Sequence, residues 1–200
     1  MVSQSLMELS SVIIKPADCI LAIAIPTTKK SFLANLNSVN DIDFTRRNLL
    51  QMHTKEFIKP AKGAIKRIIN KGVEIHKDVS FNDFNNILKK NFKALILFAH
   101  NFNDRIEFYD GLYEAQTVNA IIPNKVFIFD LNSCNCDTLA ELVSATKTNI
   151  VTKYGQYRKT IPLYWILFYE YFFELLNQKQ LTYFDAMQYT YNNFSKKLLI

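Results

Sequence analysis

Residues 94–101 read ALILFAHN and decide the fold. Six consecutive apolar residues are typical of a strand that is buried on both faces of a parallel sheet, and this strand runs directly into His100. Further candidate strands are 19–26 (CILAIAIP), 72–80 (GVEIHKDVS), 125–131 (KVFIFDL) and 149–155 (NIVTKYG). Because longer segments of helical periodicity separate them, the sequence predicts an α/β fold with a mostly parallel central sheet flanked by helices.

Several residues mark where the helices begin and end. Apolar periodicity predicts a long helix over 43–70, which bends at Pro60 because proline lacks the amide hydrogen that a continuous helix needs, and which ends before Gly72. Ser80 is predicted to cap the helix that follows the second strand. The aromatic-rich C-terminal third predicts two helices that are joined near residues 178–182.

The composition indicates a single globular domain over residues 1–200. Apolar residues make up 49% of the chain and aromatic residues 14%, whereas Gly (4) and Pro (5) are few, so disordered, collagen-like and linker-rich architectures are excluded. Three cysteines are too few for a disulfide scaffold, and the first residues lack the features of a secretory signal. The apolar runs are too short for a membrane span. We therefore expect a cytoplasmic protein without a membrane partner.

Positive charge is concentrated in one part of the chain. The net charge is +6, and residues 29–93 alone hold fourteen basic and six acidic residues. A basic patch favours binding to nucleic acid in general, because neutralising phosphates drives such binding. Five lysines of this stretch follow near-helical spacing, which predicts a solvated helix face: Lys55, Lys59, Lys62, Lys66 and Lys71. Since no glycine-rich loop, zinc-ligand spacing or stacking motif accompanies them, no nucleic-acid partner is expected.

Two residues with complementary chemistry follow two of the candidate strands. In an open parallel sheet, ligands bind beyond the carboxyl ends of the strands, and His100 and Cys134 both lie just beyond such ends. A thiol becomes a good nucleophile when it loses its proton, and a nearby imidazole can take that proton and later return it to a leaving amine. If the two strands are neighbours, the pair predicts nucleophilic catalysis by Cys134 with His100 as its base.

Three segments together resemble a known family of peptidases. They are ALILFAHN (94–101), IEFYDGLYEAQTVNAIIP (106–123) and KVFIFDLNSC (125–134). They resemble the core of the CHAT-type caspase-like cysteine peptidases, the group that includes separase. In that family a strand ends in His, a polar segment with an Asp-Gly turn and a short helix follows, and the next strand ends in a small residue and the nucleophilic Cys.

The resemblance continues into the C-terminal helices. An aromatic-rich helix with Phe168-Tyr169, and a second helix that begins near Asp185-Ala186, are similar to the closing helices of the family. The similarity covers about residues 73–195.

The resemblance implies a three-layer caspase-like fold and an endopeptidase that cleaves a protein substrate with a His-Cys dyad and no cofactor. Cys134 would be the nucleophile and His100 the general acid and base. Backbone N–H groups of Asn101 and Cys134 would form the oxyanion hole, which stabilises charge that develops in the transition state. The resemblance further implies control by a regulatory protein partner, as in bacterial antiviral defence or cell death. A chain of 200 residues would then be nearly all catalytic domain.

Two departures from the family pattern keep a second interpretation open. Asn101 stands where such enzymes commonly have Gly, and Asn-Cys-Asp-Thr follows Cys134 in place of an acidic residue, Thr and Gly. Because asparagine tolerates the left-handed backbone conformation better than most residues, Asn101 is expected to present its N–H in that conformation. The alternative function is a catalytically inactive module of the same fold that binds peptides or serves as a scaffold.

Other residues near the fourth strand have more than one candidate role. Cys136 is an alternative nucleophile, a redox partner or a core residue. Asp130 and Asp137 flank the loop and are candidates for an S1 pocket that takes a basic side chain, or for caps of the loop. Cys134, Cys136 and His100 lack the second pair of ligands that structural zinc sites use, so no metal is expected.

The other two histidines and the loop after the first strand carry no motif for catalysis or ligand binding. His53 and His76 have no partner in the sequence and are predicted to lie at the surface or to pack. A flavodoxin-like ligand-binding domain would need a phosphate-binding loop after the first strand, and residues 26–32 (PTTKKSF) contain no glycine to form one. The sequence therefore does not favour that function.

Overall fold

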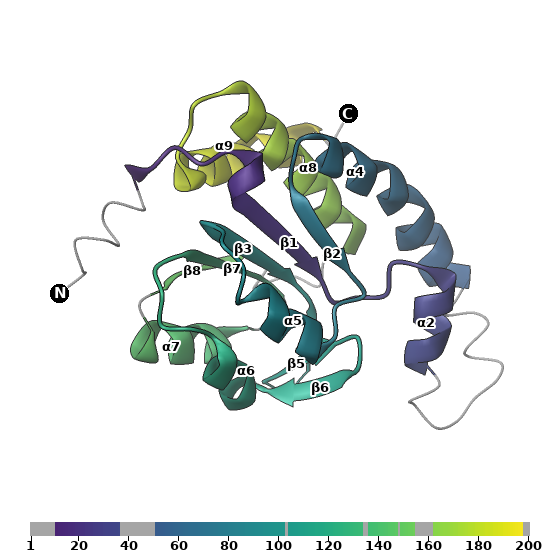
Figure 1. The fold of residues 1–200 in the computed structure, drawn as a ribbon. Coiled ribbons are helices and arrows are strands. Elements are labelled where there is room, and N and C mark those ends of the chain that lie inside the picture. Colours follow the sequence, from purple (N-terminus) through teal and green to yellow (C-terminus); the bar gives the residue numbers. More distant parts are fainter. Residues whose placement is uncertain are drawn as a thin grey trace.

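The centre of the molecule is a five-stranded sheet in which every neighbouring pair of strands is parallel (Figure 1). The computed structural model describes residues 11–36, 51–102, 104–133, 136–147, 149–154 and 162–197. In spatial order the strands are β2 (Glu74–Lys77), β1 (Cys19–Ile23), β3 (Ala94–Phe98), β7 (Ile128–Asn132) and β8 (Ile150–Tyr154). Each of them lies within or overlaps a predicted strand, so the prediction of an α/β fold with a parallel sheet is confirmed.

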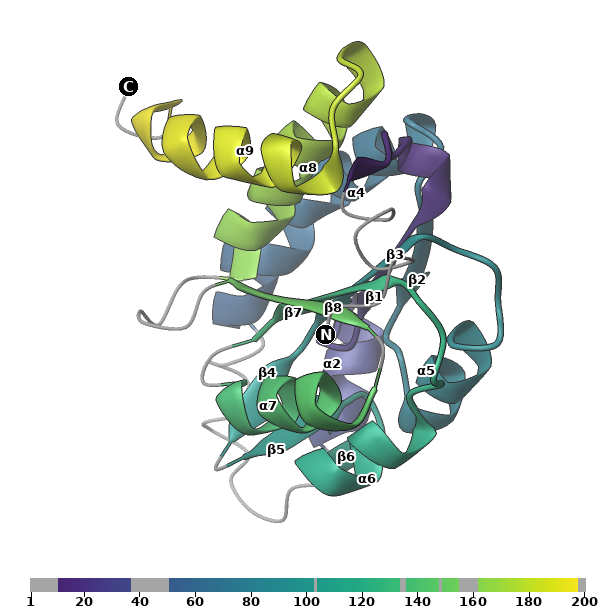
Figure 2. The same cartoon turned by 90° about the vertical axis from the view of Figure 1, so that its left-hand side faces the viewer.

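Helices cover both faces of the sheet (Figures 1 and 2). One face carries α4 (Lys59–Asn70), α8 (Pro162–Gln178) and α9 (Tyr183–Lys197). The other face carries α5 (Phe81–Ile87), α6 (Ala115–Ile121) and α7 (Asp137–Thr146). In the part of the chain that the structure describes, no helix combines the length and the apolar character needed to cross a membrane.

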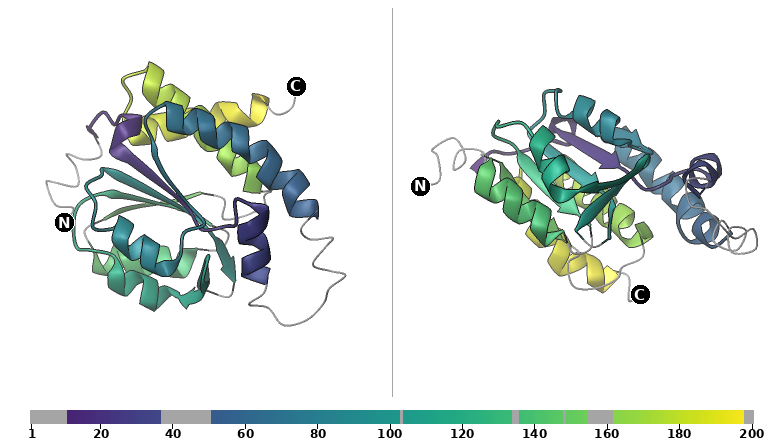
Figure 3. Two further views of the ribbon diagram at one scale, coloured as in Figure 1. Left: turned by 45° about the vertical axis from the view of Figure 1, so that its right-hand side comes forward. Right: turned by 90° about the horizontal axis from the view of Figure 1, so that it is seen from below.

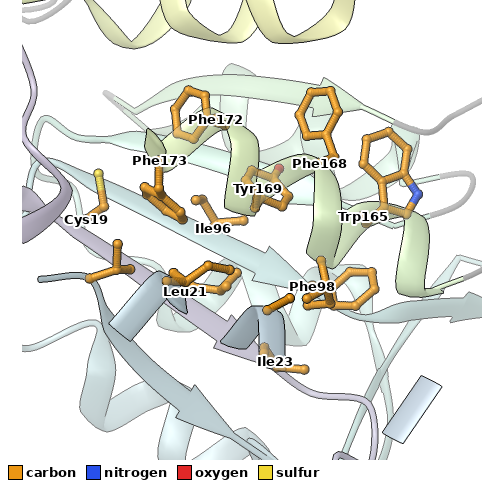
Figure 4. Close-up of a cluster of buried hydrophobic side chains, with 14 of the residues drawn as sticks. Cys19, Leu21, Ile23, Ile96, Phe98, Trp165, Phe168, Tyr169, Phe172 and Phe173 are labelled. Atoms are coloured by element: carbon orange, nitrogen blue, oxygen red, sulfur yellow. The ribbon is translucent and has the colours of Figure 1, made fainter. Parts of the chain in front are cut away.

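The side chains of the strands alternate between two cores. In β1, Cys19, Leu21 and Ile23 point toward α8, whereas Ile20 and Ala22 point to the opposite face. The first core is dominated by aromatic rings of α8, which lie over Leu21, Ile96 and Phe98 in Figure 4. These rings belong to Trp165, Phe168, Tyr169, Phe172 and Phe173. The apolar C-terminal run is therefore a buried aromatic helix, as predicted.

The long helix before β2 accommodates Pro60 by widening. The start of this helix, predicted at residue 43, lies outside the described residues. Residues Thr54–Ile58 form a π-helical turn, in which the Lys59 amide donates to the Thr54 carbonyl. The ring of Pro60 would clash with a carbonyl one α-helical turn earlier, and the wider π turn relieves that clash. The predicted bend is thus a local π turn, after which α4 continues to Asn70.

The predicted helix boundaries around β2 are confirmed. Gly72 has a φ of 93°, a left-handed conformation that ends α4 and that side chains disfavour. The Ser80 hydroxyl accepts a hydrogen bond from the Asp83 amide, and the Asp83 carboxylate accepts one from the Ser80 amide. This reciprocal capping box fixes the start of α5.

Three features are absent from the sequence-based expectations. One is α2 (Lys29–Leu36), and another is α7, which begins right after Cys136. The third is a small antiparallel sheet of β4 (His100–Phe102), β5 (Arg105–Phe108) and β6 (Gly111–Glu114). Its strands are too short for a period-2 pattern to be recognised, and they gain their stability because Ile106 and Phe108 are buried in the second core.

Candidate functional site

Strands β3 and β7, which precede His100 and Cys134, are direct neighbours. They are parallel, and Phe98 lies opposite Asn132 in their register. Beyond this pair, the Ala99 amide donates to the Asn132 carbonyl at 3.2 Å, so the two chains still run side by side as they leave the sheet. His100 follows Phe98 by two positions, and Cys134 follows Asn132 by two positions.

Cys134, the predicted nucleophile, lies outside the described residues, as does Asn135. The residues on either side of the gap are well buried: Ser133 is 6% exposed and Cys136 is 0% exposed. The Oγ atom of Ser133 and the Nδ2 atom of Asn132 have no hydrogen-bond partner among the described residues. Two buried, unsatisfied polar groups therefore stand immediately before Cys134, at the carboxyl edge of the sheet.

A hydrogen bond connects the loops that follow the two strands. The Thr138 hydroxyl, in the first turn of α7, donates to the Asp104 carboxylate at 2.8 Å. Asp104 forms the turn between β4 and β5 with a φ of 63°. The small antiparallel sheet and the start of α7 are thereby held together next to the gap at residues 134–135.

His100 is half-buried at the start of β4. Burial lowers the pKa of its imidazole below the ordinary value of 6.5, and the positive charge of a protonated His53 lowers it further. Both effects favour the neutral ring at pH 7. A neutral imidazole carries one unprotonated ring nitrogen, and this is the protonation state that a general base requires.

His53 lies at this edge of the sheet, where its ring packs, which is one of the two roles predicted for it. Its Nε2 atom donates to the Pro26 carbonyl at 2.8 Å, and its ring stacks on Phe32 with centroids 4.6 Å apart. Burial also lowers the pKa of His53. The position could not be inferred from the sequence, because His53 precedes α4 and meets the loop after β1 only through the tertiary fold.

Glu107 is a second residue that sequence reasoning missed. It lies directly opposite His100 in the antiparallel pairing of β4 with β5. Residues opposite each other in an antiparallel pair place their side chains on the same face of the sheet. Burial raises the pKa of the Glu107 carboxyl. An acid therefore stands beside the candidate base in a half-buried position.

Asn101 adopts a different backbone from the one expected. It lies in the middle of β4, where it pairs with Ile106, and its φ is not positive. The expectation of a left-handed Asn101 is wrong because the chain pairs with β5 as a strand directly after Ala99. To contribute to an oxyanion hole, its N–H would have to donate a hydrogen bond from an extended backbone conformation.

The remaining candidate residues lie in the core or at a helix start. Cys136 is fully buried in the second core, and its thiol faces the Leu131 carbonyl at 3.9 Å. Asp130 lies in the middle of β7 and is 0% exposed, a position far from a loop cap or an open S1 pocket. Asp137 is exposed in the first turn of α7, where a negative charge favours the helix dipole.

In the described ranges, no group of three or more His, Cys, Asp or Glu side chains is arranged to hold a metal ion. No protein-family model matches the chain, and no curated protein matches it.

Proposed function

We propose that the protein is a cysteine endopeptidase in which Cys134 is the nucleophile and His100 the general base. The observation that carries this proposal is the strand register: β3 and β7 are adjacent and parallel, and each candidate residue follows the Phe98 and Asn132 pair by two positions. Strands in a sheet are about 4.8 Å apart, so residues at equal distances beyond one register pair begin within reach of each other.

The protonation state of His100 supports this chemistry. Because the pKa of His100 is lowered, its imidazole is neutral at pH 7, the protonation state that can take the thiol proton as sulfur attacks a peptide carbonyl. The imidazolium then returns the proton to the leaving amine, and water hydrolyses the thioester. The proposed substrate is a protein or peptide. A role in antiviral defence or cell death rests on the family resemblance alone. Regulation by a protein partner is part of the same proposal.

Alkylation by iodoacetamide tests the dyad without knowledge of the substrate. We expect Cys134 to react at pH 7 at least about tenfold faster than a free thiol, because a positioned base removes its proton. His100→Ala should lower the rate to that of a free thiol. Since protonation of His100 abolishes the base, the rate should fall only as the pH drops below 6.5, the ordinary pKa of histidine. Mass spectrometry of the labelled peptides identifies the reacting residue.

Cys136→Ala is the matched control, since it removes a thiol two positions away. Its fully buried sulfur predicts no labelling of Cys136 in the folded protein and an unchanged rate at Cys134. A Cys134 that reacts no faster than a free thiol, or a rate that is insensitive to His100→Ala, would contradict the proposal. The chain would then be the catalytically inactive peptide-binding module. Incubation with a peptide library checks turnover, which Cys134→Ala should abolish.

A further inference from the structure

A pocket of about 450 Å³ opens beside the sheet, and His100 is not among the described residues that line it. It lies where β1 and β2 end, between the start of α2 and the face of α4 (Figures 1 and 3). Its volume falls in the range of about 300–1,000 Å³ that small-molecule sites occupy. The rim and the floor differ in chemistry, and each is formed by residues from distant parts of the chain.

Four ammonium groups surround the pocket. They belong to Lys29 of α2, Lys62 and Lys66 of α4, and Lys77 of β2. Within the described ranges of the chain, none of the four forms an ion pair, whereas Lys71, Lys90 and Lys93 each pair with an acid. Four exposed, uncompensated cations around one concave site create a positive potential that favours an anionic ligand.

One acidic residue lies next to the pocket lining. Asp78 follows Lys77, and its carboxylate accepts hydrogen bonds from the Thr27 amide at 2.6 Å and the Thr27 hydroxyl at 3.0 Å. A single carboxylate does not balance the charge of four lysines. The first turn of α2 contains no acid and begins with Lys29 and Lys30. Positive charge at a helix N-terminus opposes the helix dipole, so these lysines are placed unfavourably for the stability of α2. An anion bound at this end of the helix would relieve that repulsion.

The floor of the pocket is apolar. Ile58, Ile65 and Ile69 line it, and Ile69 is 46% exposed. Exposed isoleucine between lysine side chains offers a surface for a hydrophobic ring or chain. The ligand that matches the whole pocket therefore combines an apolar body with an anionic group.

The loop that closes the pocket is held in place before any ligand binds. The Ser31 amide donates to the Thr28 hydroxyl at 3.0 Å, and the Thr28 amide donates to the Ser31 hydroxyl at 2.9 Å. These two bonds form a capping box at the start of α2, while Asp78 fixes Thr27. A preorganised loop reduces the entropy that binding would otherwise cost.

We propose that this pocket binds a small amphiphilic anion, a phosphate-type group attached to an apolar ring or chain. The lysine rim would hold the anionic group, and the isoleucine floor would hold the apolar part. The loop after β1 thus serves an anion through lysine side chains, although it lacks the glycines of a phosphate-binding loop. Because His100 is not among the described residues that line this pocket, the proposal does not depend on the dyad.

Calorimetric titration with 1-naphthyl phosphate, inorganic phosphate and 1-naphthol tests the proposal. We expect 1-naphthyl phosphate to bind at one site at least about tenfold more tightly than either fragment, because only the whole molecule contacts both the rim and the floor. The double variant Lys62→Glu/Lys66→Glu should weaken its binding by at least about tenfold. Ile69→Ser should weaken 1-naphthyl phosphate but leave inorganic phosphate unchanged.

The double variant Lys55→Glu/Lys59→Glu is the control, because both lysines are exposed on the same helical stretch but do not line the pocket. It makes the same change in net charge and should alter binding less than about twofold. The proposal is overturned if both double variants lose the same amount of affinity for 1-naphthyl phosphate. It is also overturned if inorganic phosphate binds as tightly as 1-naphthyl phosphate. Either result would indicate non-specific attraction to a basic surface. If Lys62→Glu/Lys66→Glu fails to fold by circular dichroism, Lys29→Glu/Lys77→Glu tests the other side of the rim.

Discussion

His100 is held neutral by two effects that act in the same direction. Burial removes the imidazole from water, which disfavours its charged form, and His53 adds repulsion between like charges. His53 is fixed by its hydrogen bond to the Pro26 carbonyl and by stacking on Phe32. The protonation of the candidate base is therefore set in part by a residue from a different segment of the chain.

Replacing His53 should raise the pKa of His100. In His53→Gln the repulsion is removed while the side-chain amide can still donate to the Pro26 carbonyl, so the pKa should move toward 6.5 but stay below it, because burial is the larger cause. Titration of the histidine ring protons by NMR measures this shift, since the chain has only three histidines. His76→Gln is the control and should leave the pKa of His100 unchanged. A pKa that does not rise in His53→Gln would show that the two rings do not interact.

The thiols of the chain are expected to differ in reactivity for a physical reason. Cys19 is fully buried, and burial raises the pKa of its thiol far above the usual value. Cys136 is equally buried. Since the thiolate is the nucleophile, these two residues should be inert in the folded protein, so selective labelling is informative about Cys134.

At the scale of elements, short polar side chains cap the first turns of two helices and so determine where these helices begin. The capping box of Ser80 and Asp83 satisfies amide groups that have no partner in the first turn of α5. The same device recurs at α2 with Thr28 and Ser31. In both cases the cap lies in the short loop between a strand and the helix that follows it, so it fixes the residue at which the helix begins.

Ser80→Ala should lower the free energy of unfolding by about 1 kcal/mol, the usual cost of losing an N-cap side chain. Urea denaturation followed by circular dichroism measures the change. Asn82→Ala is the control, because Asn82 is exposed in the first turn of the same helix and makes no contribution to the cap. A Ser80→Ala variant as stable as Asn82→Ala would mean that the capping box contributes nothing to stability.

At the scale of the whole molecule, a buried carboxylate joins the sheet to both C-terminal helices. The hydroxyls of Tyr169 in α8 and Tyr183 in α9 both donate to Oδ2 of Asp130 in β7, the first at 2.9 Å. Burial raises the pKa of Asp130 to about 6, and the two hydrogen bonds oppose that rise. Exposed ion pairs of Arg67 with Glu170 and of Lys71 with Glu174 connect α4 to the same helix α8.

The raised pKa of Asp130 makes the stability of the wild type depend on pH. The folded state holds the proton more tightly than the unfolded state, whose pKa is near 3.8, so stability is lost as the pH rises from about 4 to about 6. The difference corresponds to about 3 kcal/mol. Asp130→Asn cannot ionise, so its stability relative to the wild type should rise by about that amount between pH 4 and pH 7.

Urea denaturation of both proteins at pH 4 and pH 7 measures this relative change. Glu141→Gln provides the control, because Glu141 is exposed on α7 and water solvates its charge. It should show little relative change over the same range. If the difference in free energy of unfolding between Asp130→Asn and the wild type were the same at both pH values, Asp130 would have the same pKa in the folded and unfolded states, contrary to this prediction.

Most of the fold was predictable because local patterns specify it. Continuous apolar runs such as 94–99 predict buried parallel strands, and Gly72 and Ser80 mark helix boundaries through backbone conformation and capping. The small antiparallel sheet and α7 were not predicted, since their residues become ordered by packing against the second core and carry little signal of their own. Pro60 indicated a bend, but not that a π turn would absorb it.

The candidate site divides in the same way. The two residues proposed for the chemistry, His100 and Cys134, were visible in the sequence because each lies just beyond the end of an apolar strand. The tertiary structure alone decides the register that aligns β3 with β7. It also decides the hydrogen bond between His53 and the Pro26 carbonyl and the pairing of Glu107 with His100. The same holds for the burial of Asp130 and for the four-lysine pocket. Local sequence determines which backbone each segment prefers, whereas burial, pKa and neighbouring charges arise only when segments far apart in the chain pack together.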